Sequence, residues 1–221
     1  MNAFRAILWK DLVTEWRSRD RLVGMAVFAL LVVVTFYFAA PAGSTPEARS
    51  HLPGLLWVAY VFAALLGLGR AFASELENEA LSGLALAPGD RGWIYLGKAT
   101  ASLVFLLIVQ ALTALAFGVV FAVPLFEVAL PFALVALLGA IGLAAIGTLF
   151  SAMAVRTSYR EVMLPLLMLP LLVPVILGSV RATAGLLAGG ELAGDALRLL
   201  VVTDGVYLIV SFLCFEYVLD E

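Results

Sequence analysis

Long apolar runs set the pattern of this chain. Five of them contain no Asp, Glu, Lys or Arg, and they cover 22–40, 52–69, 99–126, 128–155 and 162–180. A helix of roughly 20 apolar residues crosses the hydrocarbon core of a bilayer with every backbone polar group satisfied. The third and fourth runs exceed that length, so we place their spans at about 99–122 and 130–153.

A sixth span is predicted near the carboxyl end. The run 199–219 is interrupted by Asp204 and Glu216, and we place its membrane-crossing part at 204–219. The second span is placed at 54–73 and the fifth at 162–180. The pattern therefore predicts an all-α polytopic membrane protein with six transmembrane helices in a single domain covering 1–221.

Composition supports a membrane protein and excludes several other classes. Hydrophobic residues make up 64% of the chain and charged residues 13%, whereas a soluble domain carries roughly 25% charged residues. A net charge of −3 leaves too little positive charge for a nucleic-acid-binding surface. The single Cys214 and the single His51 exclude an intramolecular disulfide and a Cys-clustered or multi-His metal centre within one copy of the chain.

The basic residues orient the predicted spans, because Lys and Arg near span ends stay in the cytoplasm. Five lie before the first span, three in the second connection and two in the fourth, whereas the odd-numbered connections hold three. This distribution predicts a cytoplasmic N-terminus. With six spans, the C-terminus is cytoplasmic as well.

The segment 1–21 has the pattern of a helix that lies in the membrane interface. Phe4, Leu8, Leu12 and Trp16 follow one another at four-residue intervals, and basic residues flank them. We predict an elbow helix at this position. Two roles are open for it: support of a partner's docking surface, or a simple topological anchor.

The cytoplasmic connection 74–98 contains the most concentrated acidic cluster of the chain. Three glutamates precede three leucines, a pattern typical of a short amphipathic helix that fits a partner's groove: Glu75, Glu77, Glu79, Leu81, Leu84 and Leu86. These six residues are our candidate partner-binding residues. The alternative is a solvated loop with some interfacial leucines.

Three further features concern the spans and the outer side. Small residues recur every four positions in the fourth span, which favours close packing between helices over a pore. Three prolines in the fifth span predict a kinked or locally unwound helix. The glycine-rich segment 181–203 predicts a pair of short re-entrant or interfacial helices on the extracytoplasmic side.

Polar residues inside apolar spans are costly and are therefore functional candidates. Gln110 lies in the middle of the third span, and Asp204 and Glu216 lie near opposite ends of the sixth. We take these three as candidate residues of a substrate path. The alternative is structural: Gln110 bonds to a neighbouring helix, and Glu216 pairs with a basic residue.

Lys98 is the next-to-last residue of a stretch, 92–99, that matches a phosphate-binding loop except at its last position. Ala99 stands where that loop needs a Ser or Thr hydroxyl for Mg²⁺, and a membrane span follows directly. We therefore expect no ATP site here. Lys98 is interpreted as an interfacial anchor whose charge reaches lipid headgroups.

Together these segments carry a family resemblance. The elbow, the six spans and the acidic cytoplasmic helix accompany the local sequences GLLWV at 54–58, LLGLGRAF at 65–72, LALAP at 84–88 and LGK at 96–98. The chain resembles the CcmB family, the membrane subunit of the cytochrome c maturation ABC transporter. Such a resemblance implies a permease related to the ABC-2 exporters, with 74–98 as the coupling segment.

The resemblance also implies the partners. A homodimer in the lipid bilayer of the bacterial cytoplasmic (inner) membrane would bind the ABC ATPase CcmA and work with CcmC, CcmD and the haem chaperone CcmE. ATP hydrolysis would then belong to CcmA, which binds ATP and Mg²⁺, and this chain would be no enzyme and bind no cofactor of its own; the sequence offers no clear haem ligand. The work done would be haem export or release of haem-loaded CcmE.

Two other classes stay open at this point. One is a membrane-embedded enzyme for a lipid or isoprenoid substrate, whose acidic residues would gather at one interface to hold metal and phosphate. The other is a passive assembly scaffold. Dependence on a partner's ATP hydrolysis separates the transporter from both.

Overall fold

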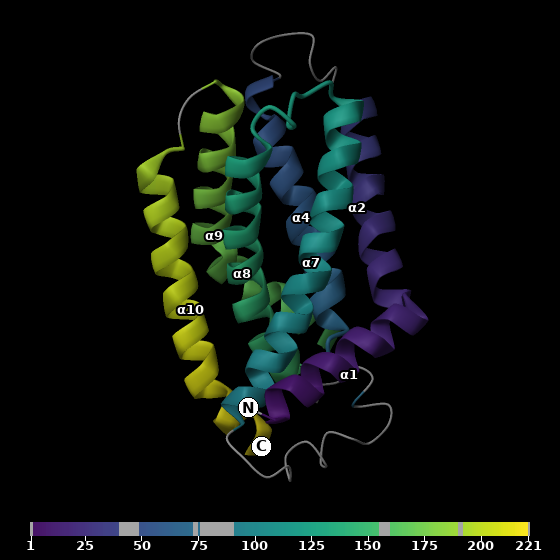
Figure 1. Ribbon diagram of the computed structural model, residues 1–221, viewed down its shortest axis with the longest axis vertical. Coiled ribbons are helices and arrows are strands. Elements are labelled where there is room, and N and C mark those ends of the chain that lie inside the picture. The colour runs from purple at the N-terminus through teal and green to yellow at the C-terminus, as the bar shows by residue number, and fades with distance from the viewer. Residues whose placement is uncertain are drawn as a thin grey trace.

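The chain is helical wherever the structure describes regular elements. The computed structural model describes residues 2–39, 49–72, 75, 91–154, 160–189 and 192–220, and within them no strand occurs. Figure 1 shows the helices, which are α1 (Asn2–Ser18), α2 (Asp20–Ala39), α4 (Leu52–Gly69), α7 (Gly92–Val120), α8 (Ala129–Ala154), α9 (Arg160–Leu187) and α10 (Gly194–Asp220).

Six of these helices, all except α1, are long and apolar enough to cross a membrane. Each corresponds to one of the six predicted spans. They stand side by side as a bundle, and both chain termini lie at the same end of it (Figure 1). We call this the basal end. The predicted count of spans therefore agrees with the helices that the structure describes.

The helices extend beyond the predicted spans at several ends. α7 begins at Gly92 instead of 99, and α10 begins at Gly194 instead of 204. The predicted re-entrant segment 181–203 is instead divided between the last turns of α9 and the first turns of α10. Leu186, Ala196 and Leu200 from these turns are buried in the bundle core, and this packing keeps them helical.

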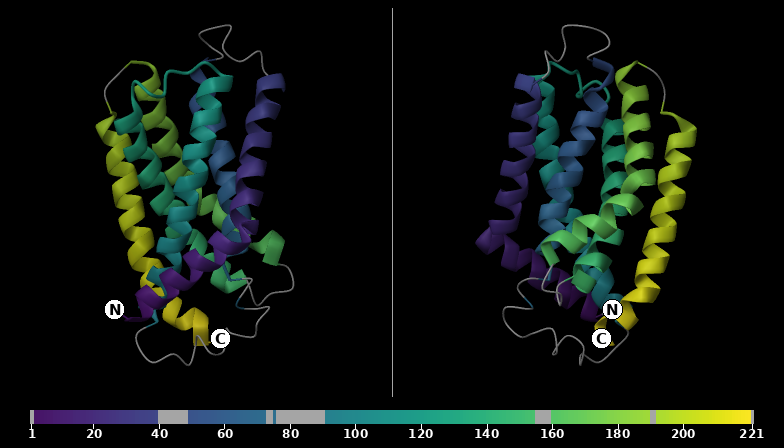
Figure 2. Two further views of the ribbon diagram at one scale, coloured as in Figure 1. Left: turned by 45° about the vertical axis from the view of Figure 1, so that its right-hand side comes forward. Right: turned by 180° about the vertical axis from the view of Figure 1, so that it is seen from behind.

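α1 crosses beneath the bundle and turns into α2 at Arg19 (Figure 2). Arg19 has a φ of 59°, the left-handed region that ends one helix and redirects the chain. The Glu15 carboxylate accepts a 2.8 Å hydrogen bond from the Leu22 backbone N–H. That bond satisfies one of the unpaired donors at the start of α2.

α1 also packs against the base of α7. A Cβ atom at Gly97 would lie 3.1 Å from the Phe4 carbonyl oxygen and 3.2 Å from the Ile7 side chain. The two helices therefore approach closely because Gly97 has no side chain. The elbow is held by tertiary contacts as well as by its apolar pattern.

α8 has the most extensive packing of the helices, against α9, α10, α7 and α4. Its small residues make this possible: a Cβ at Gly139 would lie 2.3 Å from the Trp57 ring, and one at Gly147 would lie 2.3 Å from the Leu68 side chain. The small-residue face of the fourth span is thus an internal packing surface, as its spacing predicted.

α9 contains Pro165, Pro170 and Pro174 and stays helical from Arg160 to Leu187. Its basal part turns away from the axis of the bundle (Figure 2). Each proline removes one backbone donor and crowds the preceding turn, so a bend is the expected response. The predicted kink is present, and the helix is not interrupted.

Candidate functional site

Four charged side chains meet at the basal end, where α1 passes under the start of α7. Lys10 and Asp11 come from α1, Lys98 from α7, and Glu75 from the segment that follows α4. The Lys98 Nζ lies 2.6 Å from the Glu75 Oε1 and 3.1 Å from the Asp11 Oδ2. Lys10 pairs with Glu75 and lies 3.0 Å from Asp11. We call these four residues the basal ionic cluster.

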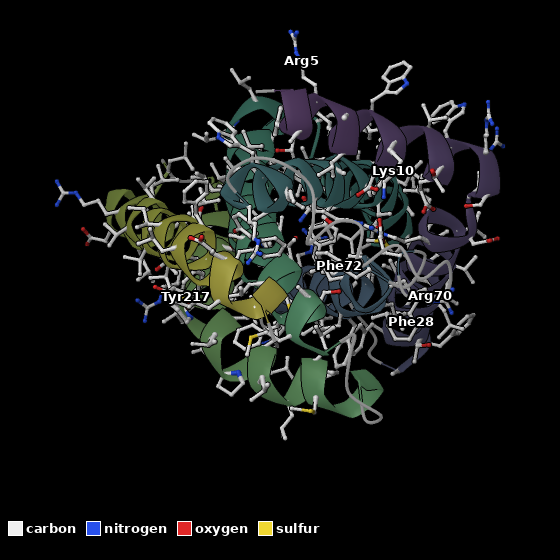
Figure 3. All side chains as sticks on the ribbon, turned by 90° about the horizontal axis from the view of Figure 1, so that it is seen from below. Arg5, Lys10, Phe28, Arg70, Phe72 and Tyr217 are labelled. Carbon is white, nitrogen blue, oxygen red and sulfur yellow. The ribbon has the colours of Figure 1, made fainter. Side chains whose placement is uncertain are left out.

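The cluster is buried at its centre. Glu75 and Lys98 are each 2% exposed, whereas Lys10 is 46% exposed at its side chain. The Lys98 ammonium also donates a 2.9 Å hydrogen bond to the Ala71 carbonyl and lies 4.6 Å from the centre of the Phe72 ring. Figure 3 looks onto this end, with Lys10 and Phe72 labelled.

Electrostatics keep Glu75 ionised in this buried place. Burial by itself would raise the pKa of the Glu75 carboxyl, but Lys98 and Lys10 outweigh it and hold that pKa at about 2. Burial would likewise lower the pKa of Lys10, and the pairing with Glu75 and Asp11 raises it instead. At neutral pH Glu75 is therefore ionised and Lys10 is protonated.

The cluster changes the interpretation of two residues. Lys98 does not reach lipid headgroups as predicted: its ammonium is enclosed by protein, because Glu75, Asp11 and the Ala71 carbonyl satisfy it there. Glu75 points inward and joins three segments. The other candidate partner-binding residues lie outside the described residues: Glu77, Glu79, Leu81, Leu84 and Leu86.

Gln110, in the middle of α7, is 3% exposed and lines an apolar cavity of about 310 Å³. Its backbone carbonyl accepts a 3.0 Å hydrogen bond from the Tyr60 hydroxyl. Its side-chain amide has no hydrogen-bond partner in the described part of the chain. Gln110 thus presents a free donor and acceptor beside this cavity.

Asp204 on α10 is 4% exposed, and neither carboxyl oxygen has a hydrogen-bond partner among the described residues. It faces α8, because a Cβ at Gly142 would lie 2.5 Å from the Asp204 Oδ1. Gly142 makes room for the carboxyl group. The structure thus confirms that a polar group lies inside the bundle at this position.

Glu216, twelve residues further along α10, lies about 18 Å from Asp204 along the helix axis. It is exposed, and its backbone carbonyl accepts a 3.2 Å hydrogen bond from Arg91. The three candidate path residues are therefore divided between α7 and two levels of α10. α4 begins at the end of the bundle opposite the basal end (Figure 1), and the exposed His51 directly precedes it in the chain.

Sequence reasoning did not find Lys10 and Asp11 as partners of Glu75. Lys10 and Glu75 are 65 residues apart, and no periodicity connects them. One signal was available in the sequence. Lys98 follows a mostly apolar stretch and directly precedes a span, and a lysine that the fold buries there needs an acidic partner.

The described residues define an α-helical membrane protein with six candidate spans and a basal helix across them. A family model described as CcmB protein matches residues 2–217. The chain belongs to the CcmB family and is a multi-pass membrane protein.

Curated relatives agree over most of the chain. A protein of Pseudomonas aeruginosa named heme exporter protein B is 28% identical over 206 residues, which cover 91% of this chain and 90% of the relative. The proteins of that name from Paracoccus denitrificans and Rhodobacter capsulatus are each 31% identical, covering 85% and 78% of this chain and the same shares of the relatives.

Proposed function

We propose that this chain is the permease subunit of an ABC transporter for cytochrome c maturation, of the ABC-2 exporter type. The names of the relatives support haem export as the function of this transporter. The alternative function is release of the haem-loaded chaperone CcmE. ATP hydrolysis belongs to a separate ATPase subunit. In this proposal the basal end faces the cytoplasm of a bacterium, in its inner membrane.

The observation that carries this proposal is the position of Glu75. It stands at the start of the acidic segment and is buried between Lys10 of α1 and Lys98 of α7. A force applied to the segment would reach α1 and α7 through these ion pairs, because short charge-assisted contacts are among the strongest non-covalent ones. Such a connection suits a segment that transmits a partner's motion.

In this proposal the residues of the coupling segment 74–98 have two different roles. Glu77, Glu79, Leu81, Leu84 and Leu86 contact the ATPase, as an amphipathic helix in a groove would. Glu75 belongs to the same binding region and anchors the segment to the bundle. ATP-driven closure of the partner then moves α1 and α7 together.

The substrate path stays a proposal as well. Gln110 and Asp204 are polar groups buried in the bundle without partners in its described part, the kind of group that a path through a membrane protein uses. Glu216 would stand at the basal exit or entrance. Haem is cargo in this proposal, and the chain binds no cofactor of its own.

The partners follow from the family. The transporter would contain two copies of this chain, the ATPase CcmA, the haem-handling membrane protein CcmC, and CcmD, and it would act on CcmE. No nucleic acid takes part.

Co-purification with the ATPase and measurement of its ATP turnover test these two roles, docking of the ATPase and anchoring of the segment to the bundle. The double variant Glu77→Lys/Glu79→Lys should lose association with the ATPase, because charge reversal removes the acidic side of the docking helix. Glu75→Gln should keep association and lower ATP turnover that depends on this chain. Arg198→Gln, on α10 away from the basal end, is the control and should leave both unchanged.

The proposal fails if the double variant Glu77→Lys/Glu79→Lys and Glu75→Gln both behave like the control. A lipid enzyme would instead show turnover by this chain alone. A passive scaffold would support cytochrome maturation with an ATPase that cannot hydrolyse ATP.

A further inference from the structure

A pocket of about 750 Å³ lies at the basal end beside the ionic cluster. Residues of α1, α2, α4 and α9 line it, together with Phe105 of α7. In the view from the basal end, the labelled Phe28 and Arg70 lie close together on the side of α2 (Figure 3). The pocket has a charged part and an apolar part.

The charged part carries both signs. Arg21 and Arg70 line it together with three carboxylates, those of Asp11, Glu15 and Asp20. Asp11 is already paired with Lys10 and Lys98, which leaves the two arginines with the Glu15 and Asp20 carboxylates and gives this part of the pocket a balance of both signs. A ligand with one positive and one negative group would match this arrangement.

Arg21 is held in place and still has capacity to bind. Its Nη2 donates a 3.1 Å hydrogen bond to the Ser102 hydroxyl, and its guanidinium carbon lies 4.8 Å from the centre of the Phe105 ring. Its Nε is buried and has no hydrogen-bond partner in the described part of the chain. A buried donor of this kind is costly unless an acceptor reaches it.

The apolar part is formed by the membrane-crossing helices. Phe28 of α2 and Phe62 of α4 have ring centres 6.3 Å apart. Phe62 is 45% exposed and Leu66 is 46% exposed, and both line the pocket. In a multi-pass membrane protein such exposed side chains meet acyl chains. The pocket therefore joins a charged rim to a surface that lipid covers.

We propose that this pocket binds a phospholipid whose headgroup carries a primary ammonium, such as phosphatidylethanolamine. The phosphate accepts hydrogen bonds from Arg21 and Arg70, and the ammonium donates to the carboxylate of Asp20. The acyl chains lie along Phe28, Phe62 and Leu66.

The choice of headgroup follows from its donors. A primary ammonium has three N–H donors for carboxylates, in the same way as a lysine side chain, whereas the quaternary ammonium of phosphatidylcholine has none. Phosphatidylglycerol lacks the positive group altogether. Because Asp20 offers a carboxylate beside the two arginines, the pocket favours phosphatidylethanolamine over both lipids.

Native mass spectrometry of the full chain in detergent tests this preference. The protein is incubated with equal amounts of phosphatidylethanolamine, phosphatidylcholine and phosphatidylglycerol, and the retained lipid is measured. Phosphatidylethanolamine should be retained about tenfold more than either of the others, as expected for the loss of one charge-assisted contact. Soluble phosphoethanolamine, which lacks acyl chains, should not displace it. Equal retention of the three lipids, or a preference for phosphatidylglycerol, overturns the proposal.

Variants locate the site. Arg70→Gln should lower retention of phosphatidylethanolamine about tenfold, whereas Arg70→Lys should keep most of it because the positive charge remains. Asp20→Asn should remove the preference over phosphatidylcholine. Arg198→Gln is the control, with the same loss of charge on another helix, and should retain the lipid like the unaltered chain. If Arg70→Gln and the control retain equal amounts, the site is elsewhere.

A photoreactive lipid gives a readout that does not depend on any variant. Phosphatidylethanolamine with a diazirine in one acyl chain should label α2 and α4 around Phe28, Phe62 and Leu66, with less label when unmodified phosphatidylethanolamine is in excess. Labelling spread evenly over all membrane-crossing helices would show an ordinary lipid annulus and contradict the proposal.

Discussion

Glu75 and Lys98 are each 2% exposed. A single unpaired charge would be unstable in such a buried position. Each is stable because it has more than one partner: Lys98 contacts Glu75, Asp11 and the Ala71 carbonyl, and Glu75 contacts both lysines. A buried ion pair adds little stability over apolar residues, but loss of one member leaves the other charge uncompensated. The basal ionic cluster therefore fixes the geometry of this end.

Removal of the Glu75 charge should destabilise the chain, and removal of the Lys98 charge as well should add less than its own separate cost. Glu75→Gln leaves Lys98 with the Asp11 carboxylate and the Ala71 carbonyl, and we expect a loss of about 3 kcal/mol in the free energy of unfolding. Glu75→Gln with Lys98→Met should cost less than the sum of the two single variants. Denaturant unfolding of the purified chain, followed by helical circular dichroism, measures all three. Additive losses would show that the two residues are not coupled.

The cluster should also depend on pH in a defined direction. The pKa of the Glu75 carboxyl is about 2 in the folded chain, against an ordinary value of 4.5 for a glutamate in an unfolded chain. The ionised carboxylate therefore stabilises the fold to its full extent above pH 4.5. This stabilising effect is lost as pH falls from 4.5 towards 2. The difference in thermal stability between the unaltered chain and Glu75→Gln should therefore be constant down to about pH 5 and narrow below pH 4.5. A difference that narrows already near neutral pH would contradict this assignment.

At the scale of elements, α8 shows how small residues determine packing in a membrane. Lipid offers no hydrophobic force between helices, so association depends on close contact. Gly139 receives the Trp57 ring, Gly142 receives the Asp204 carboxyl, and Gly147 receives the Leu68 side chain. α8 can thus contact four other helices because its surface is recessed where their side chains are large.

Gly139→Ala should destabilise the bundle. The added Cβ would lie 2.3 Å from the Trp57 ring and 2.9 Å from the Ser179 hydroxyl, too close without movement of both helices. We expect a loss of about 1–3 kcal/mol, as for other overpacked cores. Gly205→Ala on α10, where nothing lies within 4 Å of the added Cβ, is the matched control and should be neutral or slightly stabilising. Thermal unfolding in detergent compares the two, and equal midpoints would mean that α8 and α4 are less tightly packed than the structure indicates.

At the scale of the whole molecule, α1 connects the basal ends of several helices. It lies across the start of α7, turns at Arg19 into α2, and pairs through Lys10 with the segment after α4. The basal end is therefore one connected unit. A partner that moves the basal end would move helices that are distant in the sequence.

The orientation of the molecule can be tested directly. Arg5 and His51 lie at opposite ends of the bundle, and a cysteine at either position would be exposed. In a chain with Cys214→Ser, a membrane-impermeant maleimide added to intact spheroplasts should label His51→Cys and not Arg5→Cys. Permeabilised cells should give labelling of both. The reverse pattern in spheroplasts would place the basal end outside and overturn the proposed docking of a cytoplasmic ATPase.

The spans could be predicted well because the signal is local. A membrane helix satisfies its backbone hydrogen bonds within its own segment, so length and apolarity suffice to find it. The ends of α7 and α10 were missed because their extra turns, such as that of Ala196, stay helical by packing on the bundle rather than by apolar content. The small-residue face of α8 was found because its spacing is local too.

The candidate site was predicted only in part. The sequence pattern identified Glu75 as a candidate residue. It did not predict that Glu75 is buried between two lysines. Lys98 lies 23 residues away from Glu75 and Lys10 lies 65 residues away, and no spacing rule connects such positions. Gln110 and Asp204 were identified as polar residues in apolar spans, and the sequence could not reveal that Gly142 provides the space for the Asp204 carboxyl.

The sequence alone determined that the chain is a membrane protein, which segments are long and apolar enough to span a bilayer and which family it resembles, since these depend on apolar content, segment length and short motifs. The tertiary structure decided which charges meet. Lys98 is a partner of Glu75 and Asp11 instead of a headgroup anchor because α1 lies against Gly97 and brings its own charges to the same place. That contact depends on three segments being folded together.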